Sequence, residues 1–123
     1  MSWDIKLITE PKIIKLIYSG TVTPDQLKEA LTSCVTLAKK ENILRFIADT
    51  IPLVDGHSVF DLYAVIQLYE TIGFDQRMKE AVIVQVDSPA LEVASFYETA
   101  CLNRGYNVKI FSNESEAITW LSN

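Results

Sequence analysis

Side chains that could do chemistry gather in one short stretch, Asp55-Gly56-His57-Ser58, which joins a buried strand to a helix. His57 is the only histidine of the chain, and a carboxylate and a hydroxyl lie within two residues of it. A serine, an imidazole and a carboxylate are the groups of a hydrolase triad, and an imidazole with carboxylates binds divalent metals. This stretch is therefore the first candidate for a functional site.

The spacing matches neither kind of site. No G-x-S-x-G nucleophile elbow is present, and Ser58 directly follows His57, which disfavours a hydrolase. Asp49, Asp55 and Asp61 would complete an oxygen-rich metal site with His57, but this spacing fits no established ligand motif. We expect neither a metal nor another cofactor.

Three polar residues precede predicted helices, namely Ser58, Ser88 and Asn113. The free N–H groups of a helix start favour anions, so these positions also suggest a phosphate site. No glycine-rich turn or lysine accompanies them, and nearby aspartates would repel the ligand. We interpret the three residues as helix N-caps, with Pro89 reinforcing the start at Ser88.

Composition restricts the class of protein. At 123 residues and 49% hydrophobic content, we expect residues 1–123 to form one domain with one core. A net charge of −5 argues against nucleic-acid binding, and no apolar run approaches the ~20 residues of a membrane span. The N-terminal residues lack the pattern of a signal peptide, so we expect a cytoplasmic protein with two unpaired cysteines.

Hydrophobic periodicity predicts the order β-β-α-β-α-β-α-β-α. The predicted strands are 3–9, 13–19, 43–48, 81–86 and 107–111, and the predicted helices start after Thr23, Ser58, Ser88 and Asn113. The short link at Glu10-Pro11-Lys12 forces the first two strands into an antiparallel hairpin, and the helical crossovers make the others parallel. We predict an α/β fold with a five-stranded, mixed, mostly parallel sheet.

The helix after Ser58 is apolar around most of its circumference. Gln67, Glu70 and Thr71 occupy one narrow polar sector, and apolar residues cover the remainder as far as Gly73, which ends the helix. Burial between the sheet and neighbouring helices is the simpler explanation. The alternative is an interface or a pocket for an apolar ligand.

Several segments together resemble the SpoIIAA-like family of the STAS superfamily. They are the hairpin, the Thr23-Pro24-Asp25-Gln26 helix start, the strand, loop and helix of 43–73, and the ending with Phe111, Glu116-Ala117 and Trp120-Leu121. The resemblance implies a STAS-like or CRAL-TRIO-like fold in a small, mostly bacterial protein. Some members of the family suggest a capacity to hold apolar ligands, which the resemblance extends to this chain as an expectation.

STAS domains of the anti-anti-sigma type carry a phosphorylatable serine where the helix after the central strand begins, typically in Asp-Ser-Ser-Gly. The resemblance places Ser58 at that position. Here the segment reads Asp55-Gly56-His57-Ser58, so the serine doublet and the glycine after it are missing. Phosphorylation of Ser58 is implied by the resemblance alone.

We therefore expect a non-enzymatic, STAS-like regulatory or protein-interaction domain. Its surface would be the loop after the central strand and the next helix, and its partner a protein or a second copy of the chain. The residues assigned to binding are Asp55, His57, Ser58, Asp61, Tyr63, Leu68 and Tyr69.

The alternative function is a carrier or sensor of a small, lipid-like apolar ligand held between the helix after Ser58 and the sheet, and an enzyme ranks third. An enclosed pocket would favour the carrier, and exposed apolar side chains on a solid core would favour the interaction domain.

Overall fold

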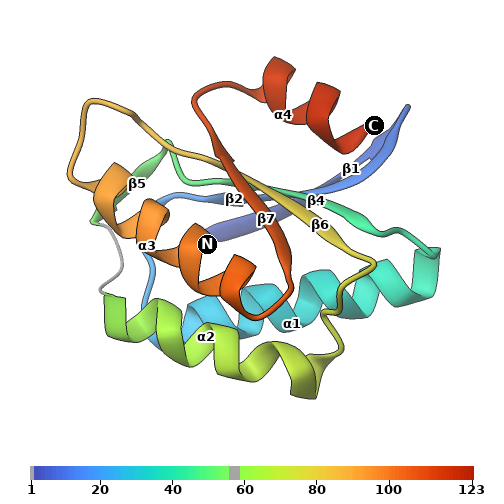
Figure 1. Ribbon diagram of the computed structural model, residues 1–123, viewed down its shortest axis with the longest axis horizontal. Coiled ribbons are helices and arrows are strands. Elements are labelled where there is room, and N and C mark those ends of the chain that lie inside the picture. Colours follow the sequence, from blue (N-terminus) through green and yellow to red (C-terminus); the bar gives the residue numbers. More distant parts are fainter. Residues whose placement is uncertain (1, 56–58) are drawn as a thin grey trace.

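The computed structural model describes residues 2–55 and 59–123, with a five-stranded mixed sheet at its centre (Figure 1). In order across the sheet, the strands are β1 (Trp3–Thr9), β2 (Lys12–Tyr18), β4 (Arg45–Asp49), β6 (Lys79–Ile83) and β7 (Asn107–Phe111). β1 and β2 pair antiparallel, and the other neighbouring strands of this sheet pair in parallel. The predicted α/β fold with an antiparallel edge hairpin is confirmed.

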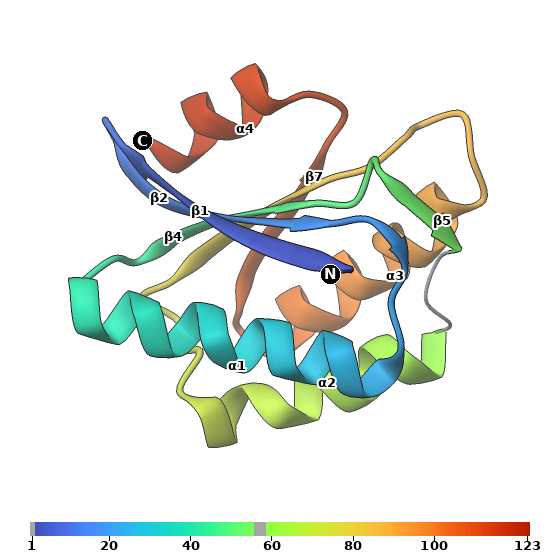
Figure 2. The same ribbon diagram turned by 180° about the vertical axis from the view of Figure 1, so that it is seen from behind.

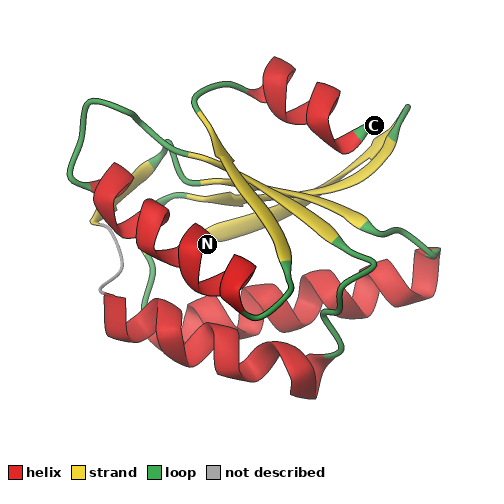
Figure 3. Ribbon diagram, viewed as in Figure 1, coloured by secondary structure: helices red, strands yellow, loops and turns green. Residues whose placement is uncertain are grey.

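Four helices in the described part of the chain cover the sheet unequally. They are α1 (Pro24–Glu41), α2 (Val59–Ile72), α3 (Ala90–Asn103) and α4 (Glu114–Leu121). Figures 1 and 2 place α1, α2 and α3 on one side of the sheet and α4 alone on the other, and Figure 3 shows these layers by secondary structure. Within residues 2–55 and 59–123, no helix is both long and apolar enough to cross a membrane.

Strand alternation divides the apolar residues into two cores. Ile14, Leu16 and Tyr18 of β2 face the larger core on the three-helix side, whereas Ile13 faces the smaller core under α4. The smaller core also contains Ile47, Ala81, Ile83, Ala117 and Leu121. Both faces of the central strands are therefore covered, as their continuous apolar sequence predicts.

α1 begins where the sequence predicts. Thr23 Oγ1 accepts a hydrogen bond from the Gln26 N–H at 3.2 Å, and Gln26 Oε1 accepts one from the Thr23 N–H at 2.9 Å. This reciprocal capping box satisfies two N–H groups that a helix start leaves open. The residues that α1 buries recur every three or four positions and form one apolar stripe: Leu27, Ala30, Leu31, Cys34, Val35 and Ala38.

α2 packs mainly against α1 and α3. Its Val65, Ile66 and Tyr69 are buried in the larger core, and the three residues of the predicted polar sector are exposed. Because α2 has a helix on each side and the sheet core beyond, burial accounts for most of its apolar circumference. This is the simpler of the two explanations given above.

A second, two-stranded sheet was not predicted. β3 (Gly20–Thr21) pairs in parallel with β5 (Leu53–Asp55), and both strands are too short to show a period in the sequence. Gly20 lies in β3 with a φ of 61°. The predicted limits of β6 were also wrong, because its ladder with β4 begins at Lys79 and ends at Ile83, before the predicted end at Val86.

Two cations anchor the end of α4 to the sheet. Arg45 and Lys79 are register partners in β4 and β6. Arg45 Nε donates to the carbonyl of Leu121, and Lys79 Nζ donates to the carbonyl of Trp120 at 3.1 Å. Cations at a helix C-terminus satisfy its last carbonyls and interact favourably with the helix dipole.

Candidate functional site

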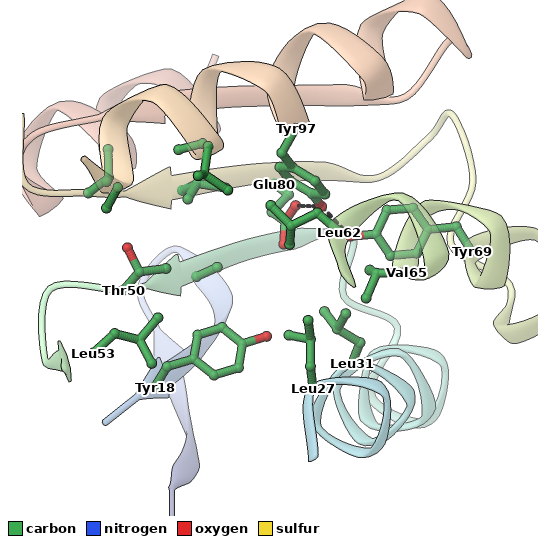
Figure 4. A pocket seen from close by; sticks show the side chains of 16 residues that line it. Tyr18, Leu27, Leu31, Thr50, Leu53, Leu62, Val65, Tyr69, Glu80 and Tyr97 are labelled. Carbon is green, nitrogen blue, oxygen red and sulfur yellow. Dashed lines mark hydrogen bonds between the residues drawn. The ribbon is translucent and has the colours of Figure 1, made fainter. Parts of the chain in front are cut away.

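An apolar pocket of about 80 Å³ lies between the sheet and the three helices that cover its larger core (Figure 4). Leucine, valine and alanine side chains from α1, α2, α3 and β5 form most of its walls. They include Leu27, Leu31, Leu53, Leu62, Val65, Val93 and Ala94. The pocket therefore lies between α2 and the sheet, where the alternative hypothesis places an apolar ligand.

β6 supplies the sheet side of the pocket. Its alternate residues Glu80 and Val82, together with Val84 just beyond its end, line the pocket, whereas Ala81 and Ile83 belong to the core under α4. This follows from the two-residue period of a strand, which sends neighbouring side chains to opposite faces. A glutamate thus occupies an inward position in a strand that is otherwise apolar.

Glu80 is part of a buried chain of hydrogen bonds between three elements. The Tyr97 hydroxyl of α3 donates to Glu80 Oε1, and the Tyr69 hydroxyl of α2 is hydrogen-bonded to the Tyr97 hydroxyl (Figure 4). Only 5% of the Glu80 surface is exposed, and Tyr69 and Tyr97 are also buried. The three buried polar groups therefore satisfy hydrogen bonds through one another.

Burial dominates the electrostatics of this chain. It raises the pKa of the Glu80 carboxyl from 4.5 to about 7, and the hydrogen bond from Tyr97 opposes that shift. Burial and the nearby Glu80 raise the pKa values of Tyr18, Tyr69 and Tyr97 well above 10. At neutral pH these tyrosines are neutral, and Glu80 exchanges its proton near physiological pH.

The two cysteines are free and buried, as predicted. Burial, reinforced by Glu80, raises the pKa values of Cys34 and Cys101 to about 12. The thiolate is the reactive form of cysteine, and at neutral pH almost none of it is present. Both side chains act as packing groups.

The predicted site residues on α2 separate into two groups. Tyr69 is buried at 1% exposure and lines the pocket, and Leu68 is half-buried. Tyr63 is 40% exposed with the Arg104 guanidinium 5.0 Å from its ring centre, and Asp61 is half-buried. Tyr69 therefore does not lie on an outer surface, and Tyr63 is the exposed aromatic residue of the predicted set.

The remaining residues of the predicted set come from the loop before α2. Asp55 is the last residue of β5, and its side chain is not described. His57 and Ser58 lie outside the described residues. Their proposed roles, including the N-cap and phosphorylation at Ser58, therefore stay predictions.

One of the predicted helix caps was wrong. The N-cap residue of α3 is Pro89, which makes no side-chain cap bond, and the Ser88 hydroxyl donates to the carbonyl of Gln85 at 2.9 Å. The reason is that β6 ends early, so a turn separates it from the helix. By contrast, Asn113 caps α4 as predicted, with its Oδ1 2.9 Å from the Glu116 N–H.

Asp49 and Thr50, adjacent at the end of β4, have different surroundings. Asp49 Oδ2 lies 4.0 Å from Lys15 Nζ, which contacts Glu114 of α4, so Asp49 faces the side opposite the pocket. The Thr50 hydroxyl lines the pocket and donates to the carbonyl of Ile83 at 2.7 Å. The two residues therefore cannot act together on one ligand in the pocket.

Sequence reasoning missed Glu80 as a site residue. Hydrophobic periodicity starts this strand at Ala81 and so leaves Glu80 outside it. A usable signal exists, because Met78, Glu80, Val82 and Val84 alternate with the residues of the opposite face. A carboxylate in register with buried residues on a central strand is a candidate site residue.

Comparisons with known proteins identify the fold. No protein-family model matches the chain, and no characterised protein matches it significantly by sequence. An uncharacterised Shewanella loihica protein with a SpoIIAA-like fold superposes with a TM-score of 0.63 at 21% identity, covering 97% of this chain and 91% of that one. An anti-sigma factor antagonist from Mycobacterium paratuberculosis superposes with a TM-score of 0.61 at 14% identity, covering 99% and 96%.

Both likenesses extend over nearly the whole of each chain, so they include the central sheet and the helices on both of its faces. At these identities they establish the arrangement of the elements. The chain has a SpoIIAA-like α/β fold, as its sequence resemblance predicts.

Proposed function

We propose that the chain is a non-enzymatic, STAS-like regulatory domain that binds a protein partner at the carboxyl end of its parallel strands. The fold supports this proposal, because it is shared with an anti-sigma factor antagonist, a protein named for its action on another regulator. In open α/β sheets, binding sites lie at the carboxyl ends of the strands.

The observation that carries the proposal is the exposure of apolar side chains at this end. Val54 of β5 is 78% exposed, and Val86, between β6 and α3, is 51% exposed. Figures 1 and 2 both show β5, the start of α3 and the start of α2 at this end, and α2 carries the exposed Tyr63. Apolar and aromatic side chains of this kind form the centres of protein interfaces.

Site-specific photo-crosslinking in cells of the source organism tests the proposal. A photoreactive amino acid replaces Val54 in one variant and Ser115 in another; Ser115 is exposed on α4, on the opposite face of the sheet. We expect a discrete crosslinked protein from position 54 and none from position 115. A product of twice the mass would identify a second copy as the partner, and equal capture at both positions would contradict the proposal.

The pocket favours a second function, that of a carrier or sensor of a small apolar ligand. Its volume of about 80 Å³ and its apolar walls are the observation behind this candidate. Ligand sites are concave and mostly apolar, with few polar groups, and this pocket has that composition. A sensor function would also be compatible with partner binding at the neighbouring strand ends.

Native mass spectrometry tests the second candidate. The protein is purified from its own organism, and its mass is compared under native and denaturing conditions. We expect extra mass in the native spectrum alone, and we expect Val93→Phe to remove it because phenylalanine would occupy the pocket. A bare protein under both conditions, or extra mass that persists in Val93→Phe, would contradict binding at this site.

A further inference from the structure

The polar groups in the pocket are few and lie close together. Among the described side chains that line it, only Tyr18, Thr50, Tyr69, Glu80 and Tyr97 carry polar atoms. Glu80, Tyr97 and Tyr69 form one continuous chain of hydrogen bonds, and the Thr50 hydroxyl hydrogen is engaged by a backbone carbonyl. A ligand in this pocket therefore meets apolar walls, the hydrogen-bonded chain that includes the Glu80 carboxyl, and the separate hydroxyl groups of Tyr18 and Thr50.

The charge of the pocket excludes anions. None of the described lining residues is basic, so a ligand carboxylate or phosphate would lose its hydration without gaining a cation. The Glu80 carboxyl, which is only 5% exposed, would also repel a bound anion whenever it is ionised. A neutral ligand avoids both penalties.

The Glu80 carboxyl retains capacity for a further hydrogen bond. A carboxyl group has two oxygens with about four acceptor positions when ionised, and one O–H donor when protonated. Tyr97 bonds Oε1, and this single bond does not saturate the group. In Figure 4 the Glu80 side chain extends from β6 toward the space between α2 and α3. A ligand hydroxyl or carbonyl at this position would be hydrogen-bonded where water is scarce.

We propose that the pocket binds a small neutral molecule with an apolar body and a single hydroxyl or carbonyl group, which hydrogen-bonds to the Glu80–Tyr97 pair. This proposal rests on the second function above and adds the chemical class of the ligand. The volume sets the size: 80 Å³ corresponds to roughly five to eight water-sized positions, so a ligand of about that many non-hydrogen atoms fits.

Phenol, toluene and benzoate test the proposal by NMR titration of the isotope-labelled protein. Phenol and toluene have nearly the same shape and differ by a hydroxyl in place of a methyl group, and benzoate adds the negative charge. The titrations are repeated with Glu80→Met, which keeps a side chain of similar length without its polar group. Glu92→Met is the matched control, because Glu92 is exposed on α3.

We expect the ratio of phenol affinity to toluene affinity to fall about tenfold in Glu80→Met, the effect of losing one buried hydrogen bond. The ratio should stay unchanged in Glu92→Met, and benzoate should bind most weakly to the native protein. Should Glu80→Met fail to fold, Tyr97→Phe removes the other half of the pair and should lower the same ratio.

The contrary outcomes separate the two proposals. If phenol and toluene both bind and Glu80→Met leaves their ratio unchanged, the hydrogen-bond assignment is overturned, while an apolar-ligand function survives. If neither compound shifts the resonances of pocket residues, both proposals are overturned. Benzoate binding more tightly than phenol, or phenol binding that persists in Val93→Phe, would overturn the neutral-ligand assignment.

Discussion

Burial of Glu80 makes the stability of this protein depend on pH. Between pH 4.5, the ordinary pKa of a glutamate, and about pH 7, the native state keeps a proton on Glu80 that the unfolded chain has released. Because the native state binds more protons in this range, the free energy of unfolding falls as the pH rises. The loss is complete once the pH exceeds the native pKa.

The size of the effect follows from the shift in pKa. Each unit corresponds to 1.36 kcal/mol, so a rise from 4.5 to about 7 gives a loss of about 3 kcal/mol between pH 4.5 and pH 8. Domains of this kind have total stabilities of about 5–15 kcal/mol. The change is therefore a measurable fraction of the whole.

Other groups around Glu80 do not titrate in this range. Tyr18 of β2, Tyr69 of α2 and Tyr97 of α3 have pKa values well above 10, and the thiols of Cys34 on α1 and Cys101 on α3 reach about 12. Each of them stays neutral up to pH 8. The slope near neutral pH is thus assigned to Glu80.

Urea denaturation at pH 5 to 8, followed by circular dichroism, measures the slope. Glu80→Gln keeps the shape and the hydrogen-bond acceptor for Tyr97 but cannot ionise, so we expect its stability to lose this slope and to exceed that of the native protein at pH 8. Glu92→Gln should keep the native slope, and His57→Gln controls for the one histidine. A native protein of equal stability at pH 5 and pH 8, or a Glu80→Gln variant with the native slope, would refute the assignment.

Three further predictions concern local features and are measured by urea denaturation. Gly73→Ala and Gly105→Ala should each cost about 1 kcal/mol, because both glycines have positive φ angles, 90° and 82°, and the Cβ at Gly73 would meet only the end of the flexible, exposed Lys39 side chain, which can move away; an unchanged stability in either variant would contradict this reasoning. Thr23→Ala should cost about 1 kcal/mol through its helix cap, and an unchanged midpoint would argue against the cap. Arg45→Met should cost about 1–3 kcal/mol by freeing the end of α4, and no loss would show that the bond is unimportant.

The parts of the fold that the sequence predicts are those with local signals. Thr23, Pro24 and Gln26 specify the start of α1 by chemistry that acts within one helical turn, and the structure contains that capping box. The hairpin of β1 and β2 follows from a link too short for a crossover. The parallel order of the other strands follows from the helices between them.

The features that could not be predicted depend on contacts distant in the sequence. β6 extends from Lys79 because its ladder with β4 starts at Arg45, more than thirty residues earlier. β3 and β5 are strands only because they pair with each other. Glu80, Tyr97 and Tyr69 lie on three different elements and are joined by hydrogen bonds, and no local sequence pattern predicts such a contact.

The site and the stability of the protein are connected through the protonation of Glu80. A ligand that donates a hydrogen bond to the ionised carboxylate lowers the pKa of Glu80, so by linkage its own affinity rises with pH through the range near 7. A ligand that accepts a hydrogen bond from the protonated carboxyl raises that pKa, and its affinity falls over the same range. Titrating phenol, a donor, and cyclohexanone, an acceptor, at pH 5.5 and pH 8 therefore reports which hydrogen bond Glu80 makes. Opposite trends for the two compounds would locate both at Glu80, and equal affinities at both pH values would place them away from it.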